Sequence, residues 1–111
     1  MQQVPYSNTG VIWDIHHTVR FFNEKPEFTV ETLGKMIKHV HLKDSVLENV
    51  KILYRMMGKG NIPVKNSINA LKSIGYDGFL SLEWVKRWAP DLEDAGIALP
   101  HFIYYIKNLD V

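Results

Sequence analysis

Within residues 38–44, KHVHLKD, polar and apolar side chains alternate from His39 to Lys43. In an extended chain His39, His41 and Lys43 fall on one side, and the two apolar residues between them fall on the other. An amphipathic helical pattern runs directly into this stretch, which predicts that helices cover the apolar side and that the imidazoles face a polar interior. This arrangement is typical of a strand in a (β/α) barrel near its catalytic end. An edge strand with solvated histidines is the alternative.

The chain repeats the succession of an apolar strand and a helical pattern. Strands are expected over three ranges, 11–14, 38–44 and 79–83. Apolar strands that alternate with helices indicate a parallel sheet in an α/β fold. A complete eight-unit barrel needs about 250 residues, so a chain of 111 residues is expected to form only part of a (β/α) TIM barrel. The predicted units lie in one domain and cover about 11–37, 38–75 and 79–109.

Capping residues and apolar periodicity place the helices. Thr29 is expected to cap a helix of about two turns that leads into the strand at 38–44. The next helix is expected from Val64 to a C-terminal cap at Gly75. The last helical pattern covers roughly 91–109, and Pro100 within it is expected to kink the helix or to start a second one.

Three polar segments are expected to be loops. The segments 15–20 and 21–28 follow the first strand and carry several ionisable groups or a proline. The segment 45–63 is long for a loop in a compact domain, which indicates a functional role or internal packing. Within it, residues 50–54 are expected to form either a short strand or one arm of a small hairpin.

Composition and charge narrow the class of protein. The 13 basic and 12 acidic side chains give a formal charge of +1, which predicts no nucleic-acid partner and no membrane surface. Cysteine is absent, so disulfides, thiolate catalysis and cysteine-based zinc sites are excluded. No apolar run is long enough to span a bilayer, and the N-terminus lacks the pattern of a signal peptide. A cytoplasmic protein is the default expectation.

Three ionisable residues occupy equivalent places on the three predicted strands. Asp14 ends the first strand, His41 lies near the end of the second, and Glu83 ends the third. Parallel strands bring their C-terminal ends to one rim, and the alternation puts all three side chains on one face. Two carboxylates with one imidazole suit Mn²⁺, Mg²⁺, Co²⁺ or Zn²⁺. As alternatives, a single histidine in a strand is often a core or surface residue, and a single aspartate at a strand end is often a helix cap.

The other histidines are expected to differ in role. His17 lies three residues after Asp14, above the same rim, and Lys43 shares the face of His41. His16 points away from Asp14 by alternation, so a packing role and a supporting role beside the site are equally open. His101 lies inside the last helix and is expected to be structural or exposed.

The sequence resembles the C-terminal part of the sugar phosphate isomerase/epimerase family, the xylose-isomerase-like TIM barrels. The resemblance covers nearly the whole chain and fits in order and spacing. Four stretches carry it: VIWDIHH at 11–17, HVHLKD at 39–44, GKGNIP at 58–63 and IGYDGFLSLEW at 74–84. The fold it implies is the last three of eight β-α units of the barrel.

The resemblance also implies roles for individual residues. Asp14, His41 and Glu83 would be metal ligands on the sixth, seventh and eighth strands. Glu83 would in addition be one of two glutamates that move a proton. Three further residues would contact the substrate: His17, Lys43 and Arg87.

The implied reaction is proton transfer next to the carbonyl of a sugar or sugar phosphate, assisted by a divalent metal. Two departures from the family pattern bear on it. Lys59 and Asn61 stand where the family's glycine turn usually carries acidic residues. The family's remaining metal-binding glutamate belongs to a strand that would precede Met1.

The absent glutamate predicts that the isolated chain is inactive. Three strand–helix units leave open sheet edges and a bare interior face, which predicts that the chain self-associates or pairs with a missing N-terminal part. A non-catalytic fragment or assembly partner is the alternative. A metal-dependent phosphoesterase of the endonuclease IV type is less favoured, because that chemistry needs more histidine ligands and a basic face.

Overall fold

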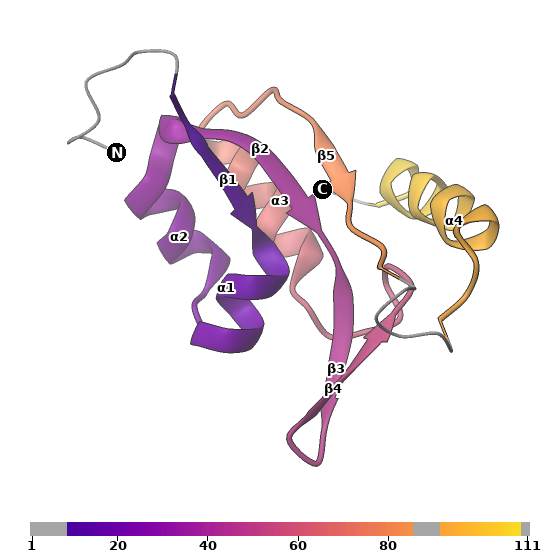
Figure 1. Cartoon of the computed structure of the whole chain (residues 1–111). Helices are drawn as coiled ribbons and strands as arrows, with labels where there is room; N and C mark the ends of the chain where they lie inside the picture. Colours follow the sequence, from indigo (N-terminus) through magenta and orange to yellow (C-terminus); the bar gives the residue numbers. More distant parts are fainter. Residues whose placement is uncertain (1–8, 86–91, 110–111) are drawn as a thin grey trace.

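The computed structural model describes residues 9–85 and 92–109. Its centre is a three-stranded parallel sheet with the order β1-β2-β5 (Figure 1). The strands are β1 (Val11–Asp14), β2 (Ile37–Leu42) and β5 (Leu80–Leu82). The parallel order and the intervening helices are those of a partial TIM barrel, as the strand and helix pattern predicts.

Besides the sheet, the described residues form four α-helices and a hairpin. The helices are α1 (Ile15–Phe22), α2 (Pro26–Leu33), α3 (Val64–Ser73) and α4 (Ala95–Lys107), with a short 3₁₀ turn, η1, at Gly34–Met36. The hairpin pairs β3 (Asp44–Glu48) with β4 (Lys51–Arg55) in antiparallel fashion. It continues from the C-terminal end of β2 and projects beyond the sheet (Figure 1). No helix in the described ranges has the length and apolar character needed to cross a membrane.

The two faces of the sheet differ sharply in burial. On the helix-covered face, Trp13, Val40 and Leu42 are buried in the core. On the opposite face, Ile12 is 62% exposed, and Phe79, just before β5, is 78% exposed. The alternation along 38–44 therefore predicts the orientation of β2 correctly. The exposed face corresponds to the interior of a barrel, since the helices cover the other face. It is exposed because no opposite barrel wall covers it in the described residues.

The segment 15–20, expected as a loop, is the helix α1, so that prediction is wrong. Asp14 has an extended backbone and its carboxylate accepts a hydrogen bond from the His17 amide, which caps the first turn. Asn23 ends the helix in the left-handed conformation, with φ of 51°. The polar composition concealed the helix, because one of the two residues that it buries, Ile15 and His16, is itself polar.

The helix expected to begin at Thr29 starts earlier, at Pro26. Proline is well suited to the first helical turn, where its missing N–H has no partner to lose. Thr29 is instead a buried residue within α2, and its hydroxyl is hydrogen-bonded to Glu24. Ile37, which precedes the strand expected at 38–44, begins β2.

The predicted strand 38–44 ends at Leu42, and Asp44 already belongs to β3. The hairpin alternative for residues 50–54 is confirmed, with Lys51–Arg55 as its second arm.

The expected C-terminal cap of α3 at Gly75 is confirmed as well. Gly75 has φ of 72°, and its N–H and that of Tyr76 donate to the carbonyls of Lys72 and Leu71, which is a Schellman arrangement.

The last helix α4 continues through Pro100 without dividing into two. The helix begins at Ala95, later than the expected range of 91–109, because residues 92–94 are not helical; residue 91 itself lies outside the described residues. Partly buried residues of its second half, including Phe102 and Ile106, pack against the core.

Candidate metal centre

The structure brings together the three residues that the strand pattern singles out. Asp14 ends β1 and pairs in register with His41 of β2. Glu83 follows β5, and its backbone N–H donates to the Leu42 carbonyl at 2.9 Å, which extends the parallel ladder by one residue. One ligand atom from each side chain lies within 4.8 Å of the others.

These distances are close to those of a coordination set. His41 Nδ1 and Glu83 Oε2 are 4.0 Å apart. Atoms that share a divalent ion lie about 3–4 Å apart, since each is about 2.0–2.2 Å from the ion. Two carboxylates and an imidazole at half-buried positions can therefore hold a divalent cation.

The state of Glu83 Oε2 supports this assignment. The atom is buried and has no hydrogen-bond partner among the described residues. A buried carboxylate oxygen without a partner is costly, because it has lost water without a replacement. A cation between Glu83, His41 and Asp14 would supply the missing interaction.

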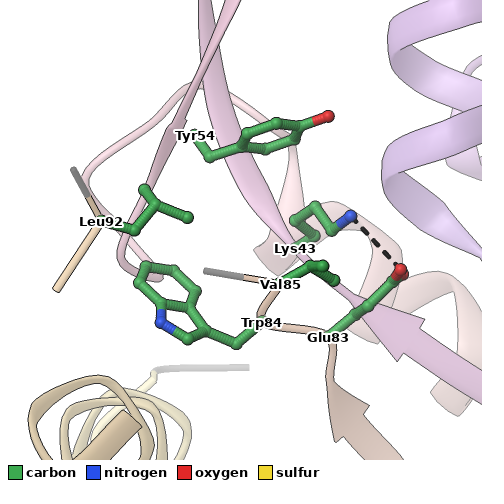
Figure 2. A pocket seen from close by; sticks show the side chains of 6 residues that line it. All are labelled: Lys43, Tyr54, Glu83, Trp84, Val85 and Leu92. Atoms are coloured by element: carbon green, nitrogen blue, oxygen red, sulfur yellow. Dashed lines mark ion pairs between the residues drawn. The ribbon is translucent and has the colours of Figure 1, made fainter. Parts of the chain in front are cut away.

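The second oxygen of Glu83 is engaged by Lys43. The Lys43 ammonium lies 3.3 Å from Glu83 Oε1 and 5.0 Å from the centre of the Tyr54 ring. Figure 2 shows the Lys43 ammonium directed at the Glu83 carboxylate, with Tyr54 from β4 beside it. These residues share an open pocket of about 100 Å³ with three apolar or aromatic neighbours, Trp84, Val85 and Leu92.

Asp14 combines two tasks. One carboxylate oxygen caps α1 by accepting the His17 N–H at 3.1 Å, which leaves the other oxygen for a ligand. The predicted alternative, a helix cap, is thus correct for Asp14 without removing it from the cluster.

The backbone N–H of His17 donates to the Asp14 carboxylate, but the His17 ring is not part of the cluster. The side chain is exposed in the first turn of α1, and its ring packs beside Phe21 and Phe22 at centroid distances of 5.0 and 5.5 Å. Its expected substrate contact stays a prediction. Arg87, the third expected substrate contact, lies outside the described residues.

His16 has a packing role. It is buried, and its Nε2 lies 2.8 Å from Ser45 Oγ. Burial, together with the nearby Lys43 and Arg20 cations, lowers the pKa of His16 to about 4. The imidazole is therefore neutral at pH 7, so its Nε2 can accept a hydrogen bond from the Ser45 hydroxyl.

Arg20 completes this buried connection between α1 and the hairpin. Its guanidinium donates to Ser45 Oγ at 3.1 Å, to the Ser45 carbonyl at 3.0 Å and to Asn61 Oδ1. Asn61 is one of the two departures from the family's glycine turn, and the structure gives its side chain a definite partner.

Asp44 organises the loop behind the site, a role the sequence reasoning missed. Its buried carboxylate accepts four backbone N–H groups, from Ser45, Gly58, Gly60 and Ile62, at 2.9–3.2 Å. The available signal was an aspartate at a strand end followed by a glycine turn, whose free amides need an acceptor.

Two further histidines lie outside the cluster. His39 shares the interior face, with its Nε2 2.9 Å from Ser81 Oγ and its ring edge-on to His41 at 5.1 Å. His101 is structural, as its Nε2 lies 2.8 Å from the Met57 carbonyl.

The fold and the cluster define a class: a partial (β/α) barrel with a carboxylate–imidazole–carboxylate set at the C-terminal rim of its strands. Comparison with known families agrees, because the family described as Xylose isomerase-like TIM barrel matches residues 1–103. The chain belongs to this family.

Solved structures give the extent of the similarity. A xylose isomerase domain protein from Planctomyces limnophilus superposes with a TM-score of 0.70 at 14% identity, over 96% of this chain and 38% of that one. A D-tagatose 3-epimerase-like protein superposes with a TM-score of 0.64 at 26% identity and the same coverage. This chain thus spans 38% of the length of either structure. The sequence has no significant match among curated proteins.

Proposed function

We propose that this chain carries the larger part of a divalent-metal centre in a sugar or sugar phosphate isomerase or epimerase. The observation that carries the proposal is the convergence of Asp14, His41 and Glu83 within 4.8 Å, with Glu83 Oε2 buried and without a hydrogen-bond partner in the part of the chain that the structure describes. The family supports an isomerase or epimerase type of reaction, and one structural neighbour is described as D-tagatose 3-epimerase-like.

The proposed role of each residue follows from its chemistry. A divalent ion held by the three side chains would polarise a carbonyl oxygen and so make a neighbouring C–H more acidic. Glu83 is the proposed base that takes or returns this proton, because it is a carboxylate at the rim and borders the pocket. We assign substrate contacts to three residues on the strength of the family resemblance: His17, Lys43 and Arg87.

We propose that a further part of the barrel, beyond the three β-α units of this chain, completes the metal centre. The resemblance implies a further glutamate ligand and a second proton-transfer group on a preceding strand. The exposed Ile12 and Phe79 on the interior face support pairing with further barrel elements, either in the same protein or in a partner. A sugar or sugar phosphate is the proposed substrate, and the division into units at 11–37, 38–75 and 79–109 is part of the same proposal.

The exposed interior face also supports a second candidate, a non-catalytic chain whose role is assembly. The two differ in whether the metal centre binds an ion. An assembly partner would associate equally well without the cluster, because Ile12 and Phe79 lie outside it.

Metal titration tests the proposed function. Mn²⁺ or Co²⁺ is expected to bind the chain in calorimetry, and His41→Ala is expected to weaken binding strongly. Glu31→Gln is the matched control, because Glu31 is an exposed carboxylate on α2 and no member of the cluster. Equal binding by wild type and by the Asp14→Ala, His41→Ala double variant would refute the metal centre.

A further inference from the structure

We propose that Lys43 is a positioning residue: held against the ring of Tyr54, it fixes one oxygen of Glu83 so that the other is presented to the metal centre. The inference rests on the proposed metal centre and adds to it a supporting pair that links the centre to the β3–β4 hairpin.

The two oxygens of Glu83 have different surroundings. Oε1 lies 3.3 Å from the Lys43 ammonium, whereas Oε2 lies 4.0 Å from His41 Nδ1 and has no hydrogen-bond partner within residues 9–85 and 92–109. A carboxylate held at one oxygen by a cation loses its freedom to rotate. The remaining oxygen then points where a ligand atom is needed, at the group formed with Asp14 and His41.

Lys43 can hold Glu83 only if its own side chain is held, because a lysine side chain has four rotatable bonds and a large entropy to lose. Its side chain is 16% exposed, and the ammonium lies 5.0 Å from the centre of the Tyr54 ring. A cation over an aromatic face is attracted to the negative potential of the ring. Figure 2 shows the ammonium between Tyr54 and the Glu83 carboxylate.

The backbone gives both residues fixed places. Lys43 is the single residue between β2 and β3, so its position follows from both strands. Tyr54 pairs with Ser45 in the β3–β4 register, and Ser45 is bound to Arg20 and lies beside His16 in the buried connection. Tyr54 therefore reaches the pocket from a strand that is tied to α1 through Ser45, and its contribution to the centre passes through Lys43.

A double-mutant cycle tests the proposal, with Mn²⁺ as the probe in calorimetry. Lys43→Met and Tyr54→Leu are each expected to weaken Mn²⁺ binding roughly tenfold, as is usual when a partner that orients a ligand is removed. Tyr54→Phe keeps the ring face and is the matched control with wild-type affinity. In a Glu83→Gln background, Lys43→Met is expected to have no further effect. Thermal unfolding of each variant checks that the fold persists.

Two outcomes would overturn the proposal. If Lys43 acted only as a nearby positive charge, its removal would tighten Mn²⁺ binding and Tyr54→Leu would have no effect. If Lys43 acted independently of Glu83, the effects of the two substitutions would add in the cycle.

A second measurement needs no metal, so it separates this inference from the proposed function. In the metal-free chain the Lys43 ammonium is expected to give a ¹⁵N–¹H signal protected from solvent exchange. The signal should vanish in Glu83→Gln and in Tyr54→Leu and persist in Tyr54→Phe. An unprotected Lys43 in the wild type would refute the positioning role, whereas failure of Mn²⁺ to bind with Lys43 protected would refute only the metal centre.

Discussion

His16 Nε2 lies 2.8 Å from Ser45 Oγ inside a buried connection that joins α1 to the β3–β4 hairpin. Arg20 donates to the same hydroxyl, so the connection contains a permanent cation next to a histidine. Protonating His16 would place a second positive charge there and remove the acceptor of the Ser45 hydroxyl. The fold therefore depends on His16 being neutral.

Stability is expected to fall as the pH is lowered below about 6.5. The pKa of His16 is about 4 in the folded chain, against 6.5 as the ordinary value. The unfolded chain thus binds the proton first, and the folded state loses on the order of 2–3 kcal/mol by pH 4. Below about pH 4 both states are protonated and this loss stops growing. Urea unfolding at several pH values measures the effect.

His16→Gln is the control for the pH effect, since its amide can occupy the same connection without titrating. The variant is expected to lose the part of the slope between pH 6.5 and 4 that belongs to this residue. An identical pH dependence in wild type and variant would contradict the assignment.

Gly60 is expected to tolerate no side chain. A Cβ there would meet the Asp44 carboxylate and the Ser45 carbonyl oxygen, with Asp44 Cγ at 2.7 Å. Because Asp44 is buried and accepts four backbone donors, it cannot move aside. Gly60→Ala should lower the free energy of unfolding by about 1–3 kcal/mol. Gly96→Ala is the control, because no described residue lies within 4 Å of a Cβ at that position, and its effect should be small or stabilising.

Val50 is expected to be replaceable by glycine with a gain in stability. It occupies the hairpin turn with φ of 60° and is 95% exposed, so its side chain buries nothing there. A β-branched residue in this region is strained by about 1–3 kcal/mol, more than the roughly 0.5–1 kcal/mol of added chain entropy that glycine costs. Val50→Gly should therefore raise the unfolding free energy by about 1 kcal/mol. Asn49→Gly, at φ of 51°, should be near neutral, because asparagine tolerates this conformation.

The 111-residue chain tested alone is expected to show no isomerase or epimerase turnover on ketoses. Glu83 is the only member of the implied glutamate pair that it carries, and loss of a proton-transfer group typically removes about 10²–10⁴ in rate. Exchange of a substrate C–H proton with solvent deuterium, followed by NMR in the presence of Mn²⁺, is the measurement. Robust metal-dependent exchange would contradict the expectation.

The chain is expected to self-associate when no further barrel elements are present. The strands β1 and β5 are the open edges of the sheet, and Ile12 and Phe79 lie exposed beside its interior face. Light scattering over a range of concentrations should show dimers or larger species. Ile12→Thr with Phe79→Ser should reduce association, whereas Phe28→Ser on α2, also an exposed apolar residue, should not. A monodisperse monomer at high concentration would contradict the prediction.

The sequence by itself determined the sheet and the members of the cluster. Alternation along 38–44 requires one side of β2 to be apolar, because successive side chains point to opposite faces, and this places His41 on the other side. Asp14 and Glu83 follow from the same rule on the neighbouring strands. Parallel pairing then brings the three strand ends together without any further information.

Only the tertiary structure shows which contacts hold these three side chains in place. The helix α1 depends on the Asp14 carboxylate turning back to the His17 amide, which composition does not reveal. Tyr54 reaches Lys43 because the β3–β4 register faces it toward the pocket, and register depends on contacts across strands. The Asp44 carboxylate accepts three N–H groups from the loop at 58–62, which lies far from it in sequence, in addition to that of the neighbouring Ser45. Periodicity is a local property of the chain, whereas these partners are separated in sequence and meet only when the chain is folded.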